Sequence, residues 1–292
     1  MNSQKKIVLL GATGSIGQST LEVIRKHSDR LKLIGISAYS NSEKLAEIAD
    51  EFKVSEAHLP ESAKQISDWP ANTYLNRSTN GLTEIATLDE ADIVVIAIVG
   101  TSGLAPTLSA LQAGKDVVLA NKESLVLGGS LVMKTAQENN VSVIPADSEH
   151  NAVFQCIQGE KNHNLESIIL TASGGPFREM RLEELNNVTV EQALNHPNWS
   201  MGKKVTIDSA TMANKGLELI EAHWLFNLPP SKLEVVIHPT SIVHAIVRFV
   251  DGCCLAQLSP PSMTFALQHA LLFPNRLEGV NSSLDFSQSL NL

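Results

Sequence analysis

Short apolar runs alternate with amphipathic segments along the first half of the chain. Residues 7–10 and 93–99 are entirely apolar, whereas residues 15–26 and 42–52 carry their apolar residues at the three- and four-residue spacing of a helix face. Runs of the first kind predict buried strands, and segments of the second kind predict helices. Their alternation from Lys6 to about Ala146 predicts an α/β fold with a doubly wound parallel sheet.

The same pattern places individual elements. It predicts strands over residues 7–10, 31–37, 93–99, 116–120 and 141–145, and helices over residues 15–26, 42–52, 104–113 and 130–139. Ligands of such sheets bind beyond the carboxyl ends of the strands. The residues that follow each predicted strand are therefore the first candidates for a binding site.

Beyond Asp147 the predicted strands are separated by longer loops and by one pronounced helix. Strands are expected over residues 167–171, 235–238, 241–249 and 254–258, and the helix over about 210–226. Asp251-Gly252 lies between the last two strands and is typical of a hairpin turn. We expect an α+β catalytic domain with a mixed or antiparallel sheet, with residues 1–146 as the first domain, 147–278 as the second and 279–292 as a linker.

Composition narrows the classes of function. The 292 residues suffice for about two domains, and the net charge of -9 argues against a protein that coats nucleic acid or an anionic membrane. No apolar run reaches the ~18 residues of a membrane span. Cys156, Cys253 and Cys254 fit neither a disulfide framework nor a C-x-x-C motif. We therefore expect a cytoplasmic protein that binds small molecules.

A glycine-rich turn, Gly11-Ala-Thr-Gly14-Ser-Ile-Gly17, joins the first predicted strand to the first predicted helix. Glycines here permit close approach of a ligand, and the N–H groups of the helix face a pyrophosphate. We interpret the turn as the dinucleotide site of a Rossmann-like domain; the alternative is an ordinary strand-to-helix turn. After the second strand, Ala38-Tyr-Ser-Asn41 contains no acid that would repel a 2′-phosphate, which favours NADP over NAD.

Two groups of carboxylates are candidates for binding a divalent cation. Asp147 and Glu149 are two residues apart after a predicted strand and would point to the same side of an extended chain. Their hard oxygens suit Mg²⁺ or Mn²⁺, but Asp147 is equally well explained as the cap of a following helix. Glu218 shares a helix face with Asn214 and Lys215, and a plain Lys–Glu surface pair is the alternative.

Hydroxyls and one ammonium group are candidates for a phosphorylated ligand. Ser173 lies in a flexible turn that contains two glycines, and Ser209 or Thr211 can either cap the helix at 210–226 or bind an anion. Lys122 follows the strand at 116–120, at the ligand edge of the sheet.

The loop at about 193–204 contains Trp199 between proline and glycine residues. We interpret this loop as a lid over the substrate, the alternative being that the tryptophan anchors the loop to the core. His150 is expected to be structural or to support a ligand residue.

These motifs resemble those of the 1-deoxy-D-xylulose 5-phosphate reductoisomerase family. They run in the same order along nearly the whole chain: Gly11-Ala-Thr-Gly-Ser-Ile-Gly17, Ala120-Asn-Lys-Glu-Ser124, Asp147-Ser-Glu-His-Asn151, Ser173-Gly-Gly-Pro-Phe177, His196-Pro-Asn-Trp-Ser-Met-Gly202 and Asp208-Ser-Ala-Thr-Met-Ala-Asn-Lys-Gly-Leu-Glu218. The resemblance implies a homodimeric, NADPH-dependent enzyme that needs Mg²⁺ or Mn²⁺, with Co²⁺ as a further candidate. It implies rearrangement and reduction of 1-deoxy-D-xylulose 5-phosphate to 2-C-methyl-D-erythritol 4-phosphate, a precursor of isoprenoids.

The resemblance also implies roles for individual residues. It places the metal on Asp147, Glu149 and Glu218, and catalytic roles on these three residues, Lys122 and His196. Substrate contacts would come from Lys122, Ser148, Glu149, Ser173, His196, Trp199, Ser209, Asn214, Lys215 and Glu218. NADPH contacts would come from Thr13, Gly14, Ser15, Ile16, Ser40, Asn41, Asn121, Glu123 and Gly202.

The chain departs from the family pattern at three places. It has Tyr39-Ser40 where members commonly have Gly-Lys, it differs across residues 261–267, and it stops at Leu292, before the family's C-terminal helical domain. The alternative hypotheses are a catalytically silent fragment that binds NADPH or metal, and a metal-dependent sugar-phosphate isomerase without redox chemistry. A short-chain dehydrogenase is disfavoured because neither tyrosine is followed by Lys four residues on. A semialdehyde dehydrogenase is disfavoured because Cys156 has no obvious paired base.

Overall fold

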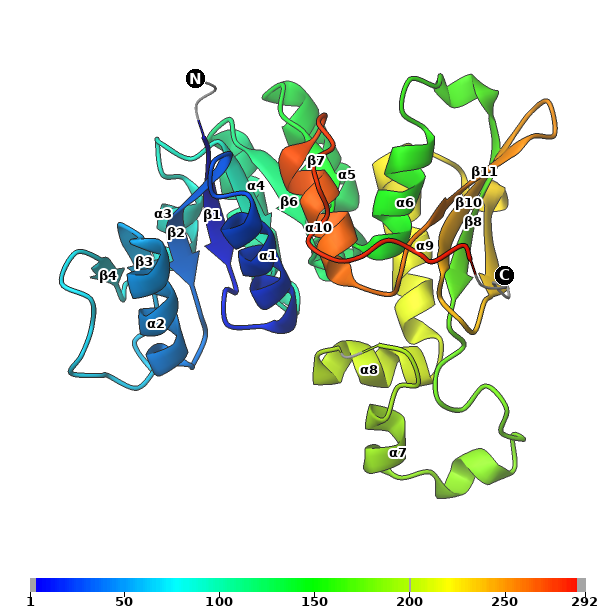
Figure 1. Ribbon diagram of the computed structural model, residues 1–292, viewed down its shortest axis with the longest axis horizontal. Coiled ribbons are helices and arrows are strands. Elements are labelled where there is room, and N and C mark those ends of the chain that lie inside the picture. Colours follow the sequence, from blue (N-terminus) through cyan, green and yellow to red (C-terminus); the bar gives the residue numbers. More distant parts are fainter. Residues whose placement is uncertain (1–3, 200, 288–292) are drawn as a thin grey trace. The chain divides into compact units, whose positions relative to one another are not determined.

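The computed structural model describes residues 4–199 and 201–287, which form two compact units (Figure 1). The first comprises the described residues up to Ala146 together with Leu267–Val280, and the second comprises Asp147–Ala266 and the described residues from Asn281 onward. Leu267–Val280 spans the end of the expected second domain, 147–278, and the start of the expected linker, 279–292, but groups with the first unit. Among the described helices, none combines the length and the apolar character that crossing a bilayer requires.

A seven-stranded sheet with the order β4-β3-β2-β1-β5-β6-β7 forms the first unit, and each neighbouring pair is parallel. The strands are β1 (Lys5–Leu10), β2 (Leu31–Ser37), β3 (Glu56–His58), β4 (Tyr74–Asn76), β5 (Ile93–Ile96), β6 (Asp116–Leu119) and β7 (Val143–Pro145). The helices are α1 (Ser15–Lys26), α2 (Ser42–Phe52), α3 (Gly81–Ala86), α4 (Leu104–Gln112) and α5 (Lys122–Glu138). The central strands are buried, as expected for a parallel sheet covered on both faces, and the predicted doubly wound fold is confirmed.

The strand order reverses at β1, because the chain runs outward from β1 to β4 and then begins again on the other side with β5. Such a reversal is where sheets of this kind bind ligands. The glycine-rich turn follows β1 at this point, and its Gly11 and Ala12 N–H groups donate to Ser37 O at 3.1 and 2.8 Å. Gly11 has a φ of +92°, and a Cβ there would lie 2.4 Å from Ala97 O, so this position requires glycine.

The segment Leu267–Val280 is tied to the first strand of the same unit. Lys5 Nζ donates to Leu271 O and Phe273 O at 3.3 and 2.8 Å, at the end of helix α10 (Met263–Leu272). Helix α10 thus begins in the residues of the second unit and ends in those of the first.

The second unit contains a four-stranded mixed sheet with the order β11-β10-β8-β9. Its strands are β8 (Leu165–Ala172), β9 (Leu233–Ile237), β10 (Val243–Phe249) and β11 (Cys254–Leu258). Strand β10 is antiparallel to β8 and β11, whereas β8 and β9 are parallel, which confirms the predicted mixed sheet and the hairpin after Val250. The helices are α6 (Ser148–Cys156), α7 (Val190–Leu194), α8 (Lys203–Ala210) and α9 (Ala213–Phe226). Helices α6 and α9 pack on the sheet through Val153, Ile168, Ala222 and Val247 (Figure 1).

Several predicted boundaries are wrong, for identifiable reasons. The helix expected at about 210–226 is α9, which begins at Ala213 because Met212 before it adopts a left-handed conformation with a φ of +62°; residue 210 is instead the end of α8. Met212 also occupies the cap position of α9, so the expected capping by Ser209 or Thr211 is wrong. Helix α5 begins at Lys122 rather than at residue 130. It bends at Gly128, and because two adjacent glycines are typical of a loop, the sequence did not indicate that the helix continues through them.

Packing in the glycine turn yields a stability test. A Cβ on Gly17 would lie 2.4 Å from Gly11 O and 2.5 Å from Ala12 O, whereas a Cβ on Gly14 would have its nearest atom at 3.5 Å. Gly17→Ala is therefore expected to lower the free energy of unfolding by about 1–3 kcal/mol. Gly14→Ala should cost no more than about 1 kcal/mol, the usual price of an alanine cap. Urea unfolding of both variants is the measurement, and equal losses would contradict the predicted steric difference.

Candidate functional site

Helix α9 turns its charged side chains toward the protein interior. Lys215, Glu218 and Glu221 are buried, whereas Ile220 on the same helix is 41% exposed. The sequence led us to expect apolar packing on one side and a polar face directed at a site on the other. Because a buried charge is costly unless it is paired, the partners of these three residues define the site.

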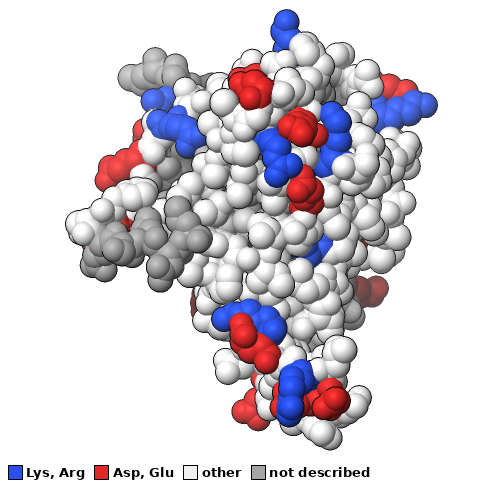
Figure 2. All heavy atoms as spheres, turned by 90° about the vertical axis from the view of Figure 1, so that its right-hand side faces the viewer, with Lys and Arg blue, Asp and Glu red and all other residues white. Residues whose placement is uncertain are grey.

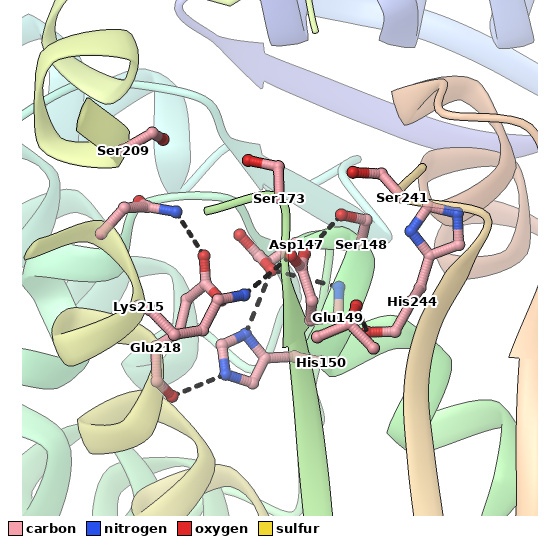
Figure 3. Close-up of polar contacts among 12 residues, drawn as sticks. Asp147, Ser148, Glu149, His150, Ser173, Ser209, Lys215, Glu218, Ser241 and His244 are labelled. Carbon is pink, nitrogen blue, oxygen red and sulfur yellow. Dashed lines mark hydrogen bonds and ion pairs between the residues drawn. The ribbon is translucent and has the colours of Figure 1, made fainter. Parts of the chain in front are cut away.

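Lys215 joins two carboxylates (Figure 3). Its Nζ donates to Glu149 Oε1 at 2.8 Å and to Glu218 Oε2. Burial by itself lowers the pKa of Lys215, but Glu149 and Glu218 outweigh burial and raise the pKa above its usual value, so the ammonium group stays charged. Two neighbours hold the other carboxylate oxygens: Ser148 Oγ donates to Glu149 Oε2 at 2.5 Å, and Asn214 Nδ2 donates to Glu218 Oε1.

Asp147 is the N-cap of α6, and its Oδ1 accepts a hydrogen bond from Glu149 N at 3.2 Å. The capping alternative is therefore confirmed, and the expected extended conformation of Asp147-Ser148-Glu149 is wrong. Carboxylate oxygens of Asp147, Glu149 and Glu218 nevertheless lie within 4.8 Å of one another. A cluster of hard oxygen atoms at this spacing fits a Mg²⁺ or Mn²⁺ ion.

His150 lies directly behind this cluster and is fully buried. Its Nε2 donates to the backbone oxygen of Glu218 at 2.8 Å, and its Nδ1 is 3.4 Å from Asp147 Oδ1 and 3.8 Å from Glu221 Oε2. Burial lowers the pKa of His150, but Glu221 and then Asp147 more than compensate and raise it to about 9. The ring is therefore an imidazolium at neutral pH.

The net charge of the whole cluster fits a divalent cation. Four carboxylates, those of Asp147, Glu149, Glu218 and Glu221, surround the two cations Lys215 and His150. With the carboxylates ionised, these six groups together carry two negative charges in excess, in a largely buried place. A divalent cation neutralises them, so the electrostatics of the cluster fit the same ion as its geometry.

Ser173 lies at the end of β8, beside the ring of His196. The Nδ1 atom of His196 accepts from Asn198 N at 3.2 Å and Trp199 N at 3.0 Å, so the proton is on Nε2, which donates to Ser173 Oγ at 2.8 Å. Burial, and then the Arg178 guanidinium, lower the pKa of His196 and favour this neutral form. Since Ser173 Oγ accepts that bond, its own hydroxyl proton points elsewhere and can be donated to a ligand oxygen.

The turn after Ser173 packs against the end of α8. Gly174 and Gly175 have φ values of +82° and +72°, and a Cβ on Gly175 would lie 2.3 Å from Ser209 O. Ser209 is therefore close to this turn, although its own Oγ donates to Val205 O within α8. The sequence had singled out both serines, and the structure brings them to neighbouring segments of one unit.

The loop expected to be a lid is anchored at its described residues. The Trp199 ring meets His244 edge-on, with ring centroids 6.0 Å apart, and Asn198 Nδ2 donates to Pro239 O. The core-anchor interpretation of the tryptophan thus has structural support, while closure of the loop over a substrate stays a prediction. Ser200, within the expected lid, lies outside the described residues.

Most of the residues expected to bind a dinucleotide lie in the first unit. Gly14 and Ser15 are exposed at the start of α1, with Thr13 and Ile16 half-buried beside them, and no side chain caps this helix. In contrast, Asn41 Oδ1 accepts from Lys44 N at the start of α2. An uncapped helix behind a glycine turn offers backbone N–H groups to a pyrophosphate, so the structure fits the expected cofactor.

Two other predicted cofactor residues, Asn121 and Glu123, bond to each other at the same edge of the sheet. Asn121 is buried; its Nδ2 donates to Ile98 O, Gly100 O and Glu123 Oε2, and its Oδ1 caps α5. Lys122, the first residue of α5, is buried too. Of the remaining predicted cofactor residues, Ser40 is exposed just before α2, and Gly202 lies at the start of α8 in the second unit.

Sequence reasoning missed Arg178 and Glu221. Arg178 Nη1 lies 3.5 Å from Ser173 O and its charge acts on His196, and Glu221 faces His150. Arg178 follows the glycine turn by three residues, a weak signal that surface arginines share. Glu221 had the clearer signal, since it lies one helical turn after Glu218 on the same face.

Comparisons with known proteins agree with this architecture. The family model for 1-deoxy-D-xylulose 5-phosphate reductoisomerase matches residues 7–129, and the model for the C-terminal domain of that enzyme matches residues 143–226. The reductoisomerase of Clostridium acetobutylicum is 49% identical over 99% of this chain and 76% of its own length, and that of Pelotomaculum thermopropionicum is 51% identical over 94% and 72%.

Solved structures give the same result. A crystal structure of DOX-P reductoisomerase in complex with NADPH, fosmidomycin and magnesium aligns with a TM-score of 0.93 and 44% identity, covering 98% of this chain and 74% of that one. The reductoisomerase from Zymomonas mobilis in complex with NADPH aligns with a TM-score of 0.87 and 40% identity, covering 98% and 75%. The chain belongs to the 1-deoxy-D-xylulose 5-phosphate reductoisomerase family.

Proposed function

We propose that this chain catalyses the rearrangement and reduction of 1-deoxy-D-xylulose 5-phosphate to 2-C-methyl-D-erythritol 4-phosphate, with one NADPH and one proton consumed per product. The observation that carries the proposal is the cluster of Asp147, Glu149 and Glu218 beside the Ser173–His196 pair. It occurs in a chain about half identical to enzymes of this name. The alternatives of an isomerase without redox chemistry and of a silent fragment gain no support from the comparisons.

The first unit is the NADPH-binding domain in this proposal. The turn from Thr13 to Ile16 and the uncapped start of α1 bind the pyrophosphate, while Ser40 and Asn41 face the ribose and its 2′-phosphate. Asn121 holds the loop after β5 in place through Ile98 and Gly100, and so shapes the site as well as lining it. When bound, NADPH supplies the hydride for the reduction.

The second unit holds the metal and the reacting part of the substrate. Asp147, Glu149 and Glu218 are the metal ligands, Mg²⁺ or Mn²⁺ being the ions that suit them. When bound, the metal supplies a Lewis acid for the ketone and the neighbouring hydroxyl. Lys215 bonds to two of the carboxylates and lies where its ammonium group can also donate to a substrate oxygen. Lys122 and Ser148 are further proposed substrate contacts.

The phosphate group of the substrate is bound by the segments around Ser173 and Ser209. Ser173 donates its hydroxyl proton, and His196 holds that hydroxyl in the required orientation. Asn214 and Lys215 follow Ser209 by five and six residues and complete the proposed contacts. Binding at a phosphate remote from the reacting carbons positions the substrate, and Trp199 on its anchored loop excludes water there.

We also propose a cytoplasmic homodimer. The edge strands β9 and β11 expose Val235, Val236, Ile237 and Leu255, and Figure 2, which views the side of the mixed sheet, shows a broad area with few charged side chains. Exposed apolar patches of this kind mark protein interfaces. The free state of all three cysteines supports a reducing compartment.

Loss of one metal ligand tests the activity. Glu218→Gln is expected to lower the Mn²⁺-dependent oxidation of NADPH by 1-deoxy-D-xylulose 5-phosphate at least roughly 100-fold, because an uncharged amide is a poor ligand. NADPH binding, for which most of the proposed contacts lie in the other unit, should be unchanged. Glu166→Gln, at an exposed glutamate of β8, is the matched control and should keep full activity. Turnover in Glu218→Gln at the level of the control would refute the assigned metal site.

The Ser173–His196 pair predicts a pH dependence. Because the pKa of His196 is lowered in the folded chain, its neutral form stabilises the loop above about pH 6.5, and that stabilisation is lost as the pH falls through the lower folded pKa. An imidazolium cannot accept from Asn198 N and Trp199 N. Fluorescence of Trp199, in a Trp69→Phe/Trp224→Phe background, should therefore change on acidification. His196→Asn should abolish that transition, and its persistence in the variant would exclude His196 as the titrating group.

The proposed dimer is tested by its mass and its interface. Sedimentation equilibrium should give twice the chain mass of 31.5 kDa. Ile237→Lys, which places a charge on the exposed edge strand, should shift the protein toward the monomer. A chain that is monomeric at micromolar concentration before any substitution would rule the dimer out.

A further inference from the structure

The buried pair His150–Glu221 lies behind the metal carboxylates and has no part in the proposed chemistry. We propose that His150 and Glu221 are positioning residues that hold α6 and α9 in register, and thereby set the affinity of the three-carboxylate site for its divalent cation. The inference rests on the proposed metal site and adds to it the groups that determine its geometry.

The metal ligands come from two separate helices. Asp147 and Glu149 belong to the start of α6, whereas Glu218 belongs to the second turn of α9. A cluster of carboxylates pushes these helices apart by charge repulsion, since the side chains are largely shielded from water. The bond from Lys215 Nζ on α9 to Glu149 Oε1 on α6 opposes this repulsion at Glu149, and a second contact between the helices is needed to hold Asp147 and Glu218 at the same spacing.

His150 provides that contact at the right place. It lies on α6 between the ligands of that helix and the core, and its Nε2 donates to the backbone oxygen of Glu218, the ligand of α9. Its Nδ1 faces Asp147 Oδ1 at 3.4 Å (Figure 3). One ring therefore touches a ligand residue on each helix, and any shift of α6 along α9 breaks one of the two contacts.

Glu221 fixes the ring from the opposite side. It lies three residues after Glu218, so it shares that face of α9, and its Oε2 is 3.8 Å from His150 Nδ1. The side chain of His150 is fully buried, and that of Glu221 is 4% exposed. Groups that contact the metal ligands directly, as His150 does, change metal affinity by roughly 10–100-fold when they are replaced, and Glu221 acts on the ligands through His150.

A second cation bound by Asp147, His150 and Glu221 is the competing explanation, because ligand atoms of these residues also lie within 4.8 Å of one another. The hard cations that suit this site prefer oxygen ligands, and of the two clusters found among the described residues, that of Asp147, Glu149 and Glu218 is the one that offers oxygen alone. A positioning role explains why His150 bonds to Glu218 O. A second ion would not require that bond.

Binding of Mn²⁺ to the full chain, measured from the electron paramagnetic resonance signal of the free ion, tests the inference. The unsubstituted protein should bind one Mn²⁺. Glu221→Gln should weaken binding by roughly tenfold or more and alter the line shape of bound Mn²⁺. His150→Gln combined with Glu221→Gln should be little worse than the weaker-binding single variant, because the two residues act as a unit. NADPH affinity should not change.

His223→Gln is the matched control. This histidine lies on the same helix and its Nδ1 also bonds to a backbone oxygen, that of Leu228 at 2.7 Å, but it does not contact the carboxylate cluster. Its Mn²⁺ dissociation constant should stay within about twofold of the unsubstituted value, as for a residue outside the metal's supporting contacts. If Glu221→Gln does not fold, Glu221→Asp replaces it, and the shorter carboxylate should give an intermediate affinity.

Two results would overturn the inference. One is an unchanged Mn²⁺ affinity in a folded Glu221 variant while Glu218→Gln abolishes binding. The other is two bound Mn²⁺ ions in the unsubstituted chain, one of which the Glu221 variant loses, since that establishes a second ion. Failure of the proposed function has a different signature: the unsubstituted chain binds Mn²⁺ and NADPH but turns over no substrate, whatever the variants do.

Discussion

Pairing of buried charges between α6 and α9 is the constraint on which the second unit depends. Lys215, Glu218 and Glu221 face inward, and each lies beside an oppositely charged residue of α6 or of α9 itself. Removing one member of such a cluster typically costs about 3–5 kcal/mol, because the partner is left buried and uncompensated. The helix is therefore held in place by the same groups that form the binding site. Its sequence cannot be optimised for stability and for function separately.

The rest of the unit keeps these charges in position. An apolar core of Val153, Ile168, Ala222 and Val247 fixes both helices on the mixed sheet, directly next to the polar cluster. At the end of β8, Gly175 fits against Ser209 O, so two hydroxyl-bearing segments meet without a side chain between them. Apolar packing thus holds the two helices on the sheet, whereas the polar contacts fix the position of α6 along α9.

The sequence predicted the parallel sheet and the position of the glycine turn, and it singled out Asp147, Glu149 and Glu218 as candidate metal ligands, because each of these depends on local pattern. It failed where a feature depends on contacts across the fold. Ile220 of α9 is exposed while Lys215 and Glu218 of the same helix are buried, and periodicity cannot reveal this because the charged residues are paired with another helix. His150 and Glu221 are 71 positions apart, and no local signal joins them. Strands β3 and β4, with three residues each, are too short to show a period.

The return of Leu267–Val280 to the first unit has a consequence for how the protein is made. The first strand carries Lys5, whose ammonium group bonds to Leu271 O and Phe273 O near the other end of the chain. During synthesis the sheet up to Ala146 emerges from the ribosome long before these partners exist. The amino-terminal unit therefore receives its last segment only after the whole intervening unit has been translated, so the unit that begins first is completed last.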